Sequence, residues 1–391
     1  MIATTRLTLT VLLALAVPAA APAQSVSDIL SFLLTNRAVQ TDDFSRDAAA
    51  AAATRDTVTR LLGAELATLP PSLSSAGFAY RVDSTLGTAG RATSSFGSFF
   101  TERSLTAGKG QSALGVNVRT ASYTRLDGQD LRDGRFVTTA NQFRDEAEPF
   151  DVETLTLDID SRVLTFTGSY GVTDRLDLSA AIPLVSLSLN GTRVNTYRGR
   201  EVVQAVAEAT SRGFGDVAVR AKYGLIAGTS SGLAVAGEVR LPTGREQDLL
   251  GTGTTAFSAI LVASSEHGPL GYHGNLSLSG GGLANEVAYR GAVCYSASDR
   301  VTIVGELIGR RAGEVGRITA VREPHPTIAG VDTIRLLPDT SGLATAAVVV
   351  GAKWNLTGTW ILSGHTQLPV TDRGLRSGVV TLIGLDYAFG L

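Results

Sequence analysis

The stretch Gly213–Gly244 consists of two runs of alternating residues joined by a short turn, GFGDVAVRAKYGLIAGTSSGLAVAGEVRLPTG. Alternation with a period of two indicates a β-strand with two different faces, and the Gly228–Gly232 link is typical of a hairpin. One face of the predicted hairpin is apolar and includes Val219, Tyr223 and Val235. The other face is charged and carries Asp216, Arg220, Lys222, Glu238 and Arg240.

Two folds can accommodate such a hairpin. A soluble sandwich would bury the apolar face against a second sheet and leave the charged face in water. A transmembrane barrel would turn the apolar face to lipid and the charged face to an aqueous lumen. A dry core on the charged face is excluded, because unpaired buried charges are costly. The choice between the two folds therefore depends on the rest of the chain.

Composition and targeting signals narrow the class of protein. The chain has 391 residues and a formal net charge of −2, which argues against a nucleic-acid partner. Cys294 is the only cysteine and the four histidines show no ligand spacing, so we predict no disulfide, no metal and no cofactor. Residues 1–23 combine Arg6, the apolar run Leu7–Val17 and the Ala21–Ala23 cleavage signal, which predicts a signal peptide and an exported protein.

The N-terminal part of the mature chain has a helical pattern. Residues 24–75 contain apolar residues at helical spacing, and Pro70-Pro71 would end the second helix. Because these apolar stripes need a partner, we predict a docked helical segment that plugs the periplasmic mouth of a barrel; a partner-binding arm, or helices lying free in the periplasm, are the alternatives. Residues 76–111 are predicted to be an irregular connector with a short strand at Phe78–Asp83.

Residues 112–391 read as a succession of strands. We predict twelve of them, an even number, at 112–126, 151–172, 174–190, 213–228, 232–243, 253–267, 269–281, 285–297, 300–311, 341–356, 358–369 and 376–390. Short turns alternate with longer links at 127–150, 191–212 and 311–340. An outer-membrane barrel has short periplasmic turns and longer extracellular loops, so the alternation favours the barrel over the sandwich.

Aromatic residues gather near the predicted short turns and the C-terminus: Tyr170, Tyr223, Tyr272, Tyr295, Trp354, Trp360, Tyr387 and Phe389. This distribution is typical of a periplasmic aromatic girdle. The last strand ends on an apolar residue and resembles the C-terminal signal that barrel-assembly machinery binds. Near Ser161 and Pro183 the apolar residues change sides, and we predict a β-bulge at each place.

Several motifs resemble the phenol meta-pathway degradation family of outer-membrane proteins. They are Gly213–Asp216 with Lys222-Tyr223, Leu241–Gly244, Gly251–Thr255, and Tyr170–Leu178 with Ile182-Pro183. The resemblance covers about residues 105–391 and implies a transporter-like barrel that takes up aromatic compounds.

The charged faces of the predicted strands supply the candidate site residues. We expect the lumen to be lined by Asp216, Arg220, Lys222, Glu238, Arg240, Arg290, Glu306, Arg310, Lys353 and His365, and by Asp386. Glu238 would lie opposite either Lys222 or Arg220. These charges would bind or bias a permeating solute, or else form a ladder of ion pairs that fills a narrow barrel.

An enzyme is a further possibility, because some twelve-stranded outer-membrane barrels are lipases. His273 with Ser277, or His365 with Ser363, would supply the histidine and serine that such catalysis needs. Neither pair lies in a recognisable nucleophile motif, so we predict that the protein is not an enzyme.

The sequence thus predicts an all-β, up-and-down antiparallel barrel of about twelve strands in the cell outer membrane, with the helical segment at 24–75 and the barrel at 112–391. We expect passive passage of small, hydrophobic or aromatic solutes. A surface-interaction barrel with a closed lumen is the alternative, and a lipase is a weaker one. The predicted partners are outer-membrane lipid, the barrel-assembly machinery through the last strand, and a small-molecule solute.

Overall fold

The computed structural model describes residues 25–34, 52, 55–61, 63–65, 80–82, 89–91, 93–228, 231–325 and 327–390. The predicted signal peptide, residues 1–23, lies outside this part of the chain. Among the described residues, no helix is long and apolar enough to cross a membrane.

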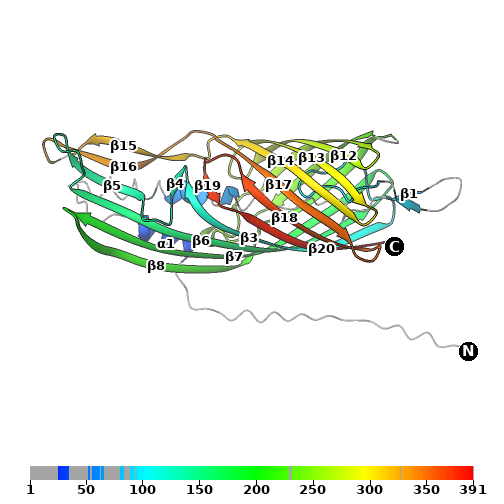
Figure 1. The fold of residues 1–391 in the computed structure, drawn as a ribbon, viewed down its shortest axis with the longest axis horizontal. Coiled ribbons are helices and arrows are strands. Elements are labelled where there is room, and N and C mark those ends of the chain that lie inside the picture. The colour runs from blue at the N-terminus through cyan, green and yellow to red at the C-terminus, as the bar shows by residue number, and fades with distance from the viewer. Residues whose placement is uncertain are drawn as a thin grey trace, which may run out of the picture.

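Twelve antiparallel strands form a closed barrel, which confirms the predicted fold class (Figure 1). Strand β20 pairs back with β3 and closes the ring. All twelve coincide with predicted strands. They are β3 (Gln111–Leu126), β6 (Asp151–Gly171), β7 (Leu176–Tyr197), β9 (Val217–Ala227), β10 (Ser231–Leu241), β11 (Ala256–His267), β12 (Leu270–Gly281), β13 (Glu286–Ser298), β14 (Val301–Ala312), β17 (Leu343–Asn355), β18 (Trp360–Pro369) and β20 (Val380–Gly390).

A second group of strands extends one side of the barrel beyond its rim. Strands β8 (Arg200–Phe214), β5 (Phe136–Phe143), β16 (Val331–Asp339) and β15 (Arg317–Pro324) continue the sheet from the ends of β7 and β6. The order β8-β7-β6-β5-β16-β15 forms a curved sheet, which we call the wall and which projects away from the short turns (Figure 1). We expected simple loops at 127–150, 191–212 and 311–340. The structure shows instead that these links contain paired strands.

The remaining elements are short. Strands β4 (Gln129–Asp130) and β19 (Leu375–Ser377) pair with the end of β3. The 3-10 helix η1 (Glu246–Asp248) lies in the link between β10 and β11. Strands β1 (Tyr80–Val82) and β2 (Ala89–Arg91) form a separate two-stranded sheet beside the short-turn end (Figure 1).

The two faces of the sheet exchange character between the barrel and the wall. On the outer face of β6, Phe166 and Leu164 are followed toward the wall by Arg162, Asp160 and Asp158. The inner face changes in the opposite sense, from Thr165 to the fully buried side chains of Ile159, Leu157 and Leu155. The outside of the barrel therefore suits an apolar medium, whereas the outside of the wall suits water.

Strands β6 and β7 themselves contain no bulge at this exchange. Burial alternates without a break around Ser161 on β6 and around Pro183 on β7, and the pairing of the two strands contains no register shift. The two predicted bulges are therefore wrong. The strands keep their phase, and what changes is the medium on each side.

A girdle of aromatic side chains surrounds the short-turn end, as predicted. Tyr170, Tyr223, Tyr272, Tyr295, Trp354 and Trp360 are exposed on the outer face, each close to a short turn. The rings of Trp360 and Tyr387 lie 4.7 Å apart, and those of Tyr387 and Phe389 lie 5.4 Å apart.

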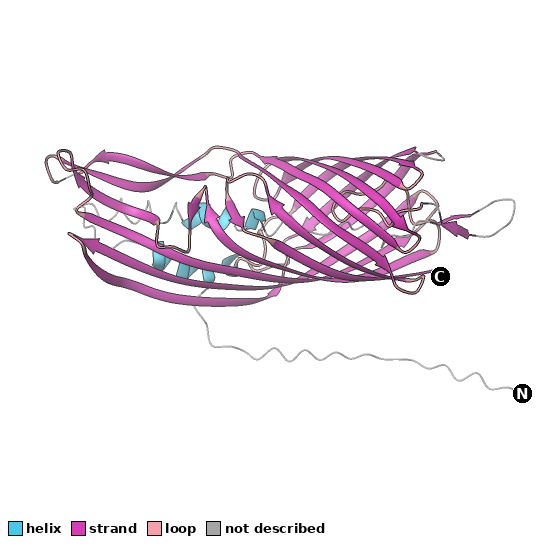
Figure 2. Ribbon diagram, in the orientation of Figure 1, coloured by secondary structure: helices cyan, strands magenta, loops and turns pink. Residues whose placement is uncertain are grey.

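Helices fill the concave side of the wall. Helix α1 (Val26–Leu34) contacts β7, β8 and η1, and Leu30 and Leu33 are fully buried. Ser25 caps the helix, because its hydroxyl accepts a hydrogen bond from the Asp28 N–H at 3.1 Å. Residues 55–61 and 63–65 are also helical, and Val58 and Leu61 join the same apolar core as α1 (Figure 2). These helical residues lie on the side of the wall and not at the short-turn mouth, where we expected a helical plug.

Candidate functional site: a strap and a chamber inside the barrel

Residues 93–107, which we call the strap, run through the lumen in its short-turn half. Near its start, the Ser94 hydroxyl donates to the Gly268 carbonyl in the β11–β12 turn. Near its end, the Thr106 hydroxyl donates to the Asp174 carbonyl in the β6–β7 turn. All strap residues between Ser95 and Ser104 are buried. The strap thus enters and leaves at the short-turn end and obstructs that half of the barrel.

The carboxylate of Glu306 on β14 holds the innermost part of the strap. It accepts hydrogen bonds from three consecutive N–H groups, those of Phe99, Phe100 and Thr101, and from the Thr101 hydroxyl at 3.1 Å. Such hydrogen bonds to an ionised acceptor are among the strongest in proteins. Glu306, which we predicted to face the lumen, therefore binds the backbone of the chain itself.

Two lysines hold the strap through its carbonyl groups. The Lys353 ammonium on β17 donates to the Ser98 carbonyl at 2.7 Å and to the Phe96 carbonyl at 3.3 Å. The Lys222 ammonium on β9 donates to the Leu105 carbonyl at 2.8 Å. Both ammonium groups would be costly to bury without these acceptors.

Other strands complete the attachment of the strap. The Asn275 side chain on β12 both accepts from the Glu102 N–H at 2.6 Å and donates to the Glu102 carbonyl at 3.0 Å. Arg290 on β13 donates to the Phe100 carbonyl at 3.2 Å, and Asp177 on β7 accepts from the Ala107 N–H at 3.0 Å. The anchors come from strands around the whole barrel, so the strap is tied across the lumen.

The strap also contributes charge and apolar surface to the lumen. The Glu102 carboxylate pairs with Arg220, and the Arg220 Nε donates to the Glu238 carboxylate at 2.9 Å. Glu238 lies opposite Arg220 in the β9–β10 hairpin, which decides between the two partners considered from the sequence.

Apolar residues of the strap pack against the inner face of the barrel. Phe99 and Phe100 pack in a buried cluster with Cys294, Val304 and Val349. The centroid of the His365 ring lies 4.3 Å from that of Phe99. Cys294 is fully buried in this arrangement, directly beside the innermost residues of the strap.

A polar chamber lies between the strap and the helical residues 63–65. Phe100 of the strap and Glu65 of the helical residues both line it, and its volume is about 90 Å³. Five arginines and three glutamates line the chamber: Arg220, Arg240, Arg290, Arg310 and Arg376, with Glu65, Glu238 and Glu286. The lining therefore has an excess of positive charge.

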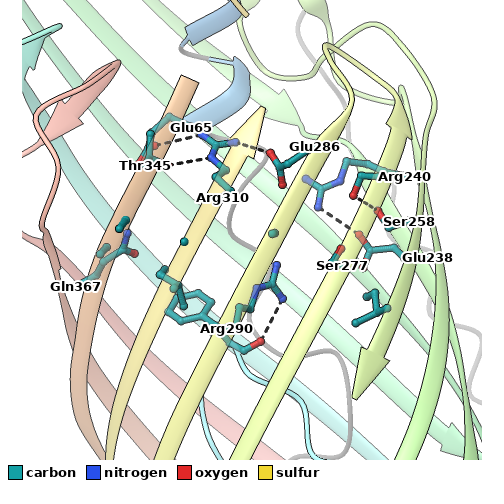
Figure 3. A pocket seen from close by; sticks show the side chains of 18 of the residues that line it. Glu65, Glu238, Arg240, Ser258, Ser277, Glu286, Arg290, Arg310, Thr345 and Gln367 are labelled. Atoms are coloured by element: carbon teal, nitrogen blue, oxygen red, sulfur yellow. Dashed lines mark hydrogen bonds and ion pairs between the residues drawn. The ribbon is translucent and has the colours of Figure 1, made fainter. Parts of the chain in front are cut away.

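Ion pairs organise the upper part of the chamber (Figure 3). Arg310 on β14 lies 3.1 Å from the Glu286 carboxylate on β13 and 3.9 Å from the Glu65 carboxylate. Its guanidinium also donates to the Ala64 carbonyl at 3.2 Å. Arg310 thus connects the helical residues to the barrel, and Ser258, Ser277 and Gln367 add uncharged polar groups to the chamber.

Of the eleven predicted lumen residues, nine fall into three groups. Lys222, Glu306, Lys353 and His365 contact the strap, and Arg220 and Arg290 contact both the strap and the chamber. Glu238, Arg240 and Arg310 line the chamber. Asp216 instead fixes the β10–β11 link, because its carboxylate accepts from the N–H groups of Gly244 and Thr252.

The sequence reasoning did not identify five polar residues of the site: Glu65, Asp177, Asn275, Glu286 and Arg376. Asn275 and Glu286 alternate with the outward residues of β12 and β13. Assigning every second residue of these strands to the lumen would therefore have identified both. Glu65 lies in a helical segment whose contact with the barrel leaves no local signal.

The two histidine and serine pairs considered for catalysis have other contacts. His273 Nδ1 lies 3.0 Å from the Ser264 hydroxyl, which also accepts from the Ser104 N–H of the strap. The Ser363 hydroxyl donates to the Gly384 carbonyl at 3.3 Å. His273 and His365 are both buried inside the barrel beside the strap.

Comparisons with known proteins give structural neighbours but no family. No family model and no curated protein matches the sequence. Among solved structures, the chain is similar to an outer-membrane channel from Pseudomonas putida F1, with 13% identity, 73% of this chain and 97% of that chain covered, and a TM-score of 0.46. It is also similar to the KdgM porin, with 9% identity, coverage of 69% and 99%, and a TM-score of 0.37. The predicted membership of the phenol meta-pathway family stays a prediction.

Proposed function

We propose that the protein is an outer-membrane channel for small solutes whose lumen is closed at the periplasmic end by the strap. The single observation that carries this proposal is a polar, arginine-rich chamber inside a barrel with an apolar exterior. A barrel with lipid outside and a hydrated, charged interior is the arrangement of a porin.

The exterior of the barrel supports its place in a membrane. Large apolar side chains such as Leu261, Leu276 and Ile303 are 45–48% exposed on the outer face, together with many others. An apolar surface of this extent is rare on a soluble monomer. The aromatic girdle marks one interface, and short turns at that end correspond to the periplasmic side.

The chamber favours small organic anions. Its arginines outnumber its glutamates, and guanidinium groups bind carboxylates with two parallel hydrogen bonds. Phe100, Ile260 and Ile308 supply apolar surface beside the arginines. A hydrophobic or aromatic solute that carries a carboxylate would therefore match the chamber on both counts, which refines the solute predicted from the sequence.

Passage through the barrel requires the strap to move. Most of its anchors are hydrogen bonds to charged side chains, and water can replace such bonds when the lumen hydrates. The apolar contacts of the strap are limited to two small clusters, one around Phe99 and Phe100 and one in which Phe96 packs with Ala113, Ile361 and Ala388. The strap therefore has the properties of a gate that opens into a wet lumen.

The test of this proposal is ion selectivity in planar bilayers. When the strap opens, the full chain should conduct with a preference for anions, and Arg376→Gln should reduce that preference on the order of twofold, because one charge is lost from a lumen screened by salt. Arg373→Gln, three residues away and exposed, is the matched control and should change nothing.

Solute uptake is measured separately by liposome swelling. Benzoate should enter faster than benzamide, which has the same ring without the charge. Equal entry of the two compounds would contradict the role of the arginines. A preference for cations would contradict the proposal as a whole.

A closed barrel that acts through its surface is the second candidate. It is favoured by one observation: the strap occupies the short-turn half of the lumen while helices fill the wall. If neither the full chain nor a variant with a weakened strap conducts, this candidate replaces the channel. We also propose that the protein is not an enzyme, since the His365 ring packs on the strap and His273 bonds to Ser264, which itself holds the strap. Hydrolysis of ester lipids by the purified protein would contradict that statement.

A further inference from the structure

The outer face of the barrel carries a polar row directly above its apolar belt. Thr120, Arg162, Ser186 and Arg212 pair with one another across β3, β6, β7 and β8, and all four side chains point outward. We call these four residues the basic row. They line a groove of about 580 Å³ on the outer surface.

The residues next to the basic row on the barrel side are apolar. Two positions along each strand, the outward residues are Val118, Leu164, Leu184 and Phe214. Val118 is 45% exposed and Phe214 is 53% exposed. The surface thus changes from apolar to basic within one step along the same four strands.

The two arginines of the basic row are available to a ligand. Arg162 and Arg212 lie on either side of Ser186 and are exposed. Within the described part of the chain, neither guanidinium makes an ion pair or a side-chain hydrogen bond. The nearest carboxylate on these strands, that of Asp160, already accepts from the Ser122 hydroxyl and lies 3.7 Å from the Arg132 guanidinium.

From this arrangement we infer that the basic row binds the phosphate of a lipid in the outer leaflet, with the acyl chains of that lipid on Val118, Leu164, Leu184 and Phe214. Two guanidinium groups with neighbouring hydroxyls are suited to a phosphate, because they combine charge with several donors. A free phosphate would use the basic row alone. The apolar residues directly beside the row fit a molecule that is anionic at one end and apolar at the other. The inference rests on the proposed function only in that the barrel must lie in an outer membrane.

The basic row also marks the level of the lipid headgroups. Arginines near a membrane surface each contribute on the order of a fivefold gain in binding to an anionic lipid. On the same strands, the wall beyond the row carries Asp158, Asn190 and Glu208, which suit water rather than a headgroup. Among the described residues of β3, β6, β7 and β8, the row is therefore where positive charge meets the apolar belt.

The experiment measures binding of lipopolysaccharide to the full chain in detergent by native mass spectrometry. Arg162→Gln and Arg212→Gln should each weaken binding about fivefold, and the double variant about 25-fold. The matched control is Arg175→Gln, an exposed arginine in the short turn of the same β6–β7 pair, which should bind as the unchanged protein does.

Further ligands separate the possible sources of the phosphate. Lipopolysaccharide stripped of its lipid A phosphates should bind the unchanged protein as weakly as the double variant binds the native lipid. Inorganic phosphate should not compete at millimolar concentration. Effective competition by inorganic phosphate, full binding of the dephosphorylated lipid, full binding by the double variant, or an equal loss in Arg175→Gln would each overturn the inference.

The outcome is independent of channel activity. A protein that binds lipopolysaccharide through the basic row but conducts no ions would refute the proposed channel and leave the lipid site intact. A protein that conducts ions but binds lipopolysaccharide equally well without its lipid A phosphates would support the channel and refute the lipid site. Heat-modifiable migration on a gel shows whether each variant has folded before binding is measured.

Discussion

A single carboxylate, that of Glu306, accepts four hydrogen bonds from three adjacent residues of the strap. The arrangement resembles the way in which consecutive N–H groups of a turn bind an anion, with the protein supplying both partners. Because the residue is 3% exposed, its charge depends on these donors. Removal of the charge should therefore release the strap without opening the barrel.

We predict that Glu306→Gln makes Cys294 accessible to a water-soluble thiol reagent. The neutral amide loses charge-assisted hydrogen bonds worth about 1.5–3 kcal/mol each, so the labelling rate should rise at least tenfold. Cys294 is the only cysteine and lies beside Phe99 and Phe100, which makes it a natural reporter of the strap. Glu286→Gln, which alters the chamber without touching the strap, is the control. Equal labelling of all three proteins would mean that Glu306 does not hold the strap closed.

Among the elements, helix α1 shows how the wall keeps its concave face apolar and filled. Arg193 on β7 lies 2.8 Å from the Glu153 carboxylate on β6, and its guanidinium donates to the Leu33 carbonyl at the end of the helix. Gly191 lies beneath the helix, where an added Cβ would lie 2.2 Å from the Leu33 Cδ1. The helix is thus fixed by a close approach and by a cation at its C-terminus.

Arg193→Met should undock α1, since it leaves Glu153 buried without a cation. Breaking a buried pair costs about 3–5 kcal/mol, whereas removing both charges is far less harmful. Hydrogen exchange of residues 26–34 should therefore accelerate strongly in Arg193→Met and return toward the original rate in the Arg193→Met/Glu153→Gln double variant. Arg200→Met, an exposed change in the same β7–β8 hairpin, should leave exchange unchanged. A double variant as fast as the single one would show that the pair does not hold the helix.

Among the secondary-structure elements, the sequence predicts the strands of the barrel well and those of the wall poorly. The twelve barrel strands follow from strict alternation and from short turns, both of which are local signals. Strands β8, β15 and β16 were not predicted, because charged and polar residues such as Glu208 and Arg212 interrupt the apolar pattern of their outer faces. The dipeptides Asp127-Gly128 and Arg198-Gly199 form two-residue turns, and all four residues have positive φ. A residue followed by glycine is a sequence signal for such a turn, and it could have revealed hairpins in these two links.

The strap and the chamber could be predicted only in part. The charged residues of the barrel interior were found from alternation, but their partners were not. Residues 93–107 are rich in serine, threonine and phenylalanine and have no period, because their hydrogen bonds go to strands about 70 to 260 residues away. No local pattern records such contacts. The sequence therefore favoured a solute path where the structure has a bound segment of the chain.

For the molecule as a whole, the exchange of faces shows where one medium ends and another begins. The same strands β6 and β7 present apolar side chains outward in the barrel and inward in the wall, with no change of phase. One continuous sheet therefore suits two environments. The barrel part suits lipid outside and water inside, and the wall suits water outside and helices inside.

This division predicts opposite outcomes for the same substitution on the same outer face. Val219 on β9 is 44% exposed within the apolar belt, and Val206 on β8 is 69% exposed on the wall. Val219→Lys should cost about 2–4 kcal/mol, because a charge near the middle of a bilayer is costly. Val206→Lys should stay within about 0.5 kcal/mol, as expected for a surface change in water. Reversible urea unfolding in lipid vesicles measures both. Equal losses at the two positions would show that the membrane does not end between them, and would remove the basis for placing lipid headgroups at Arg162 and Arg212.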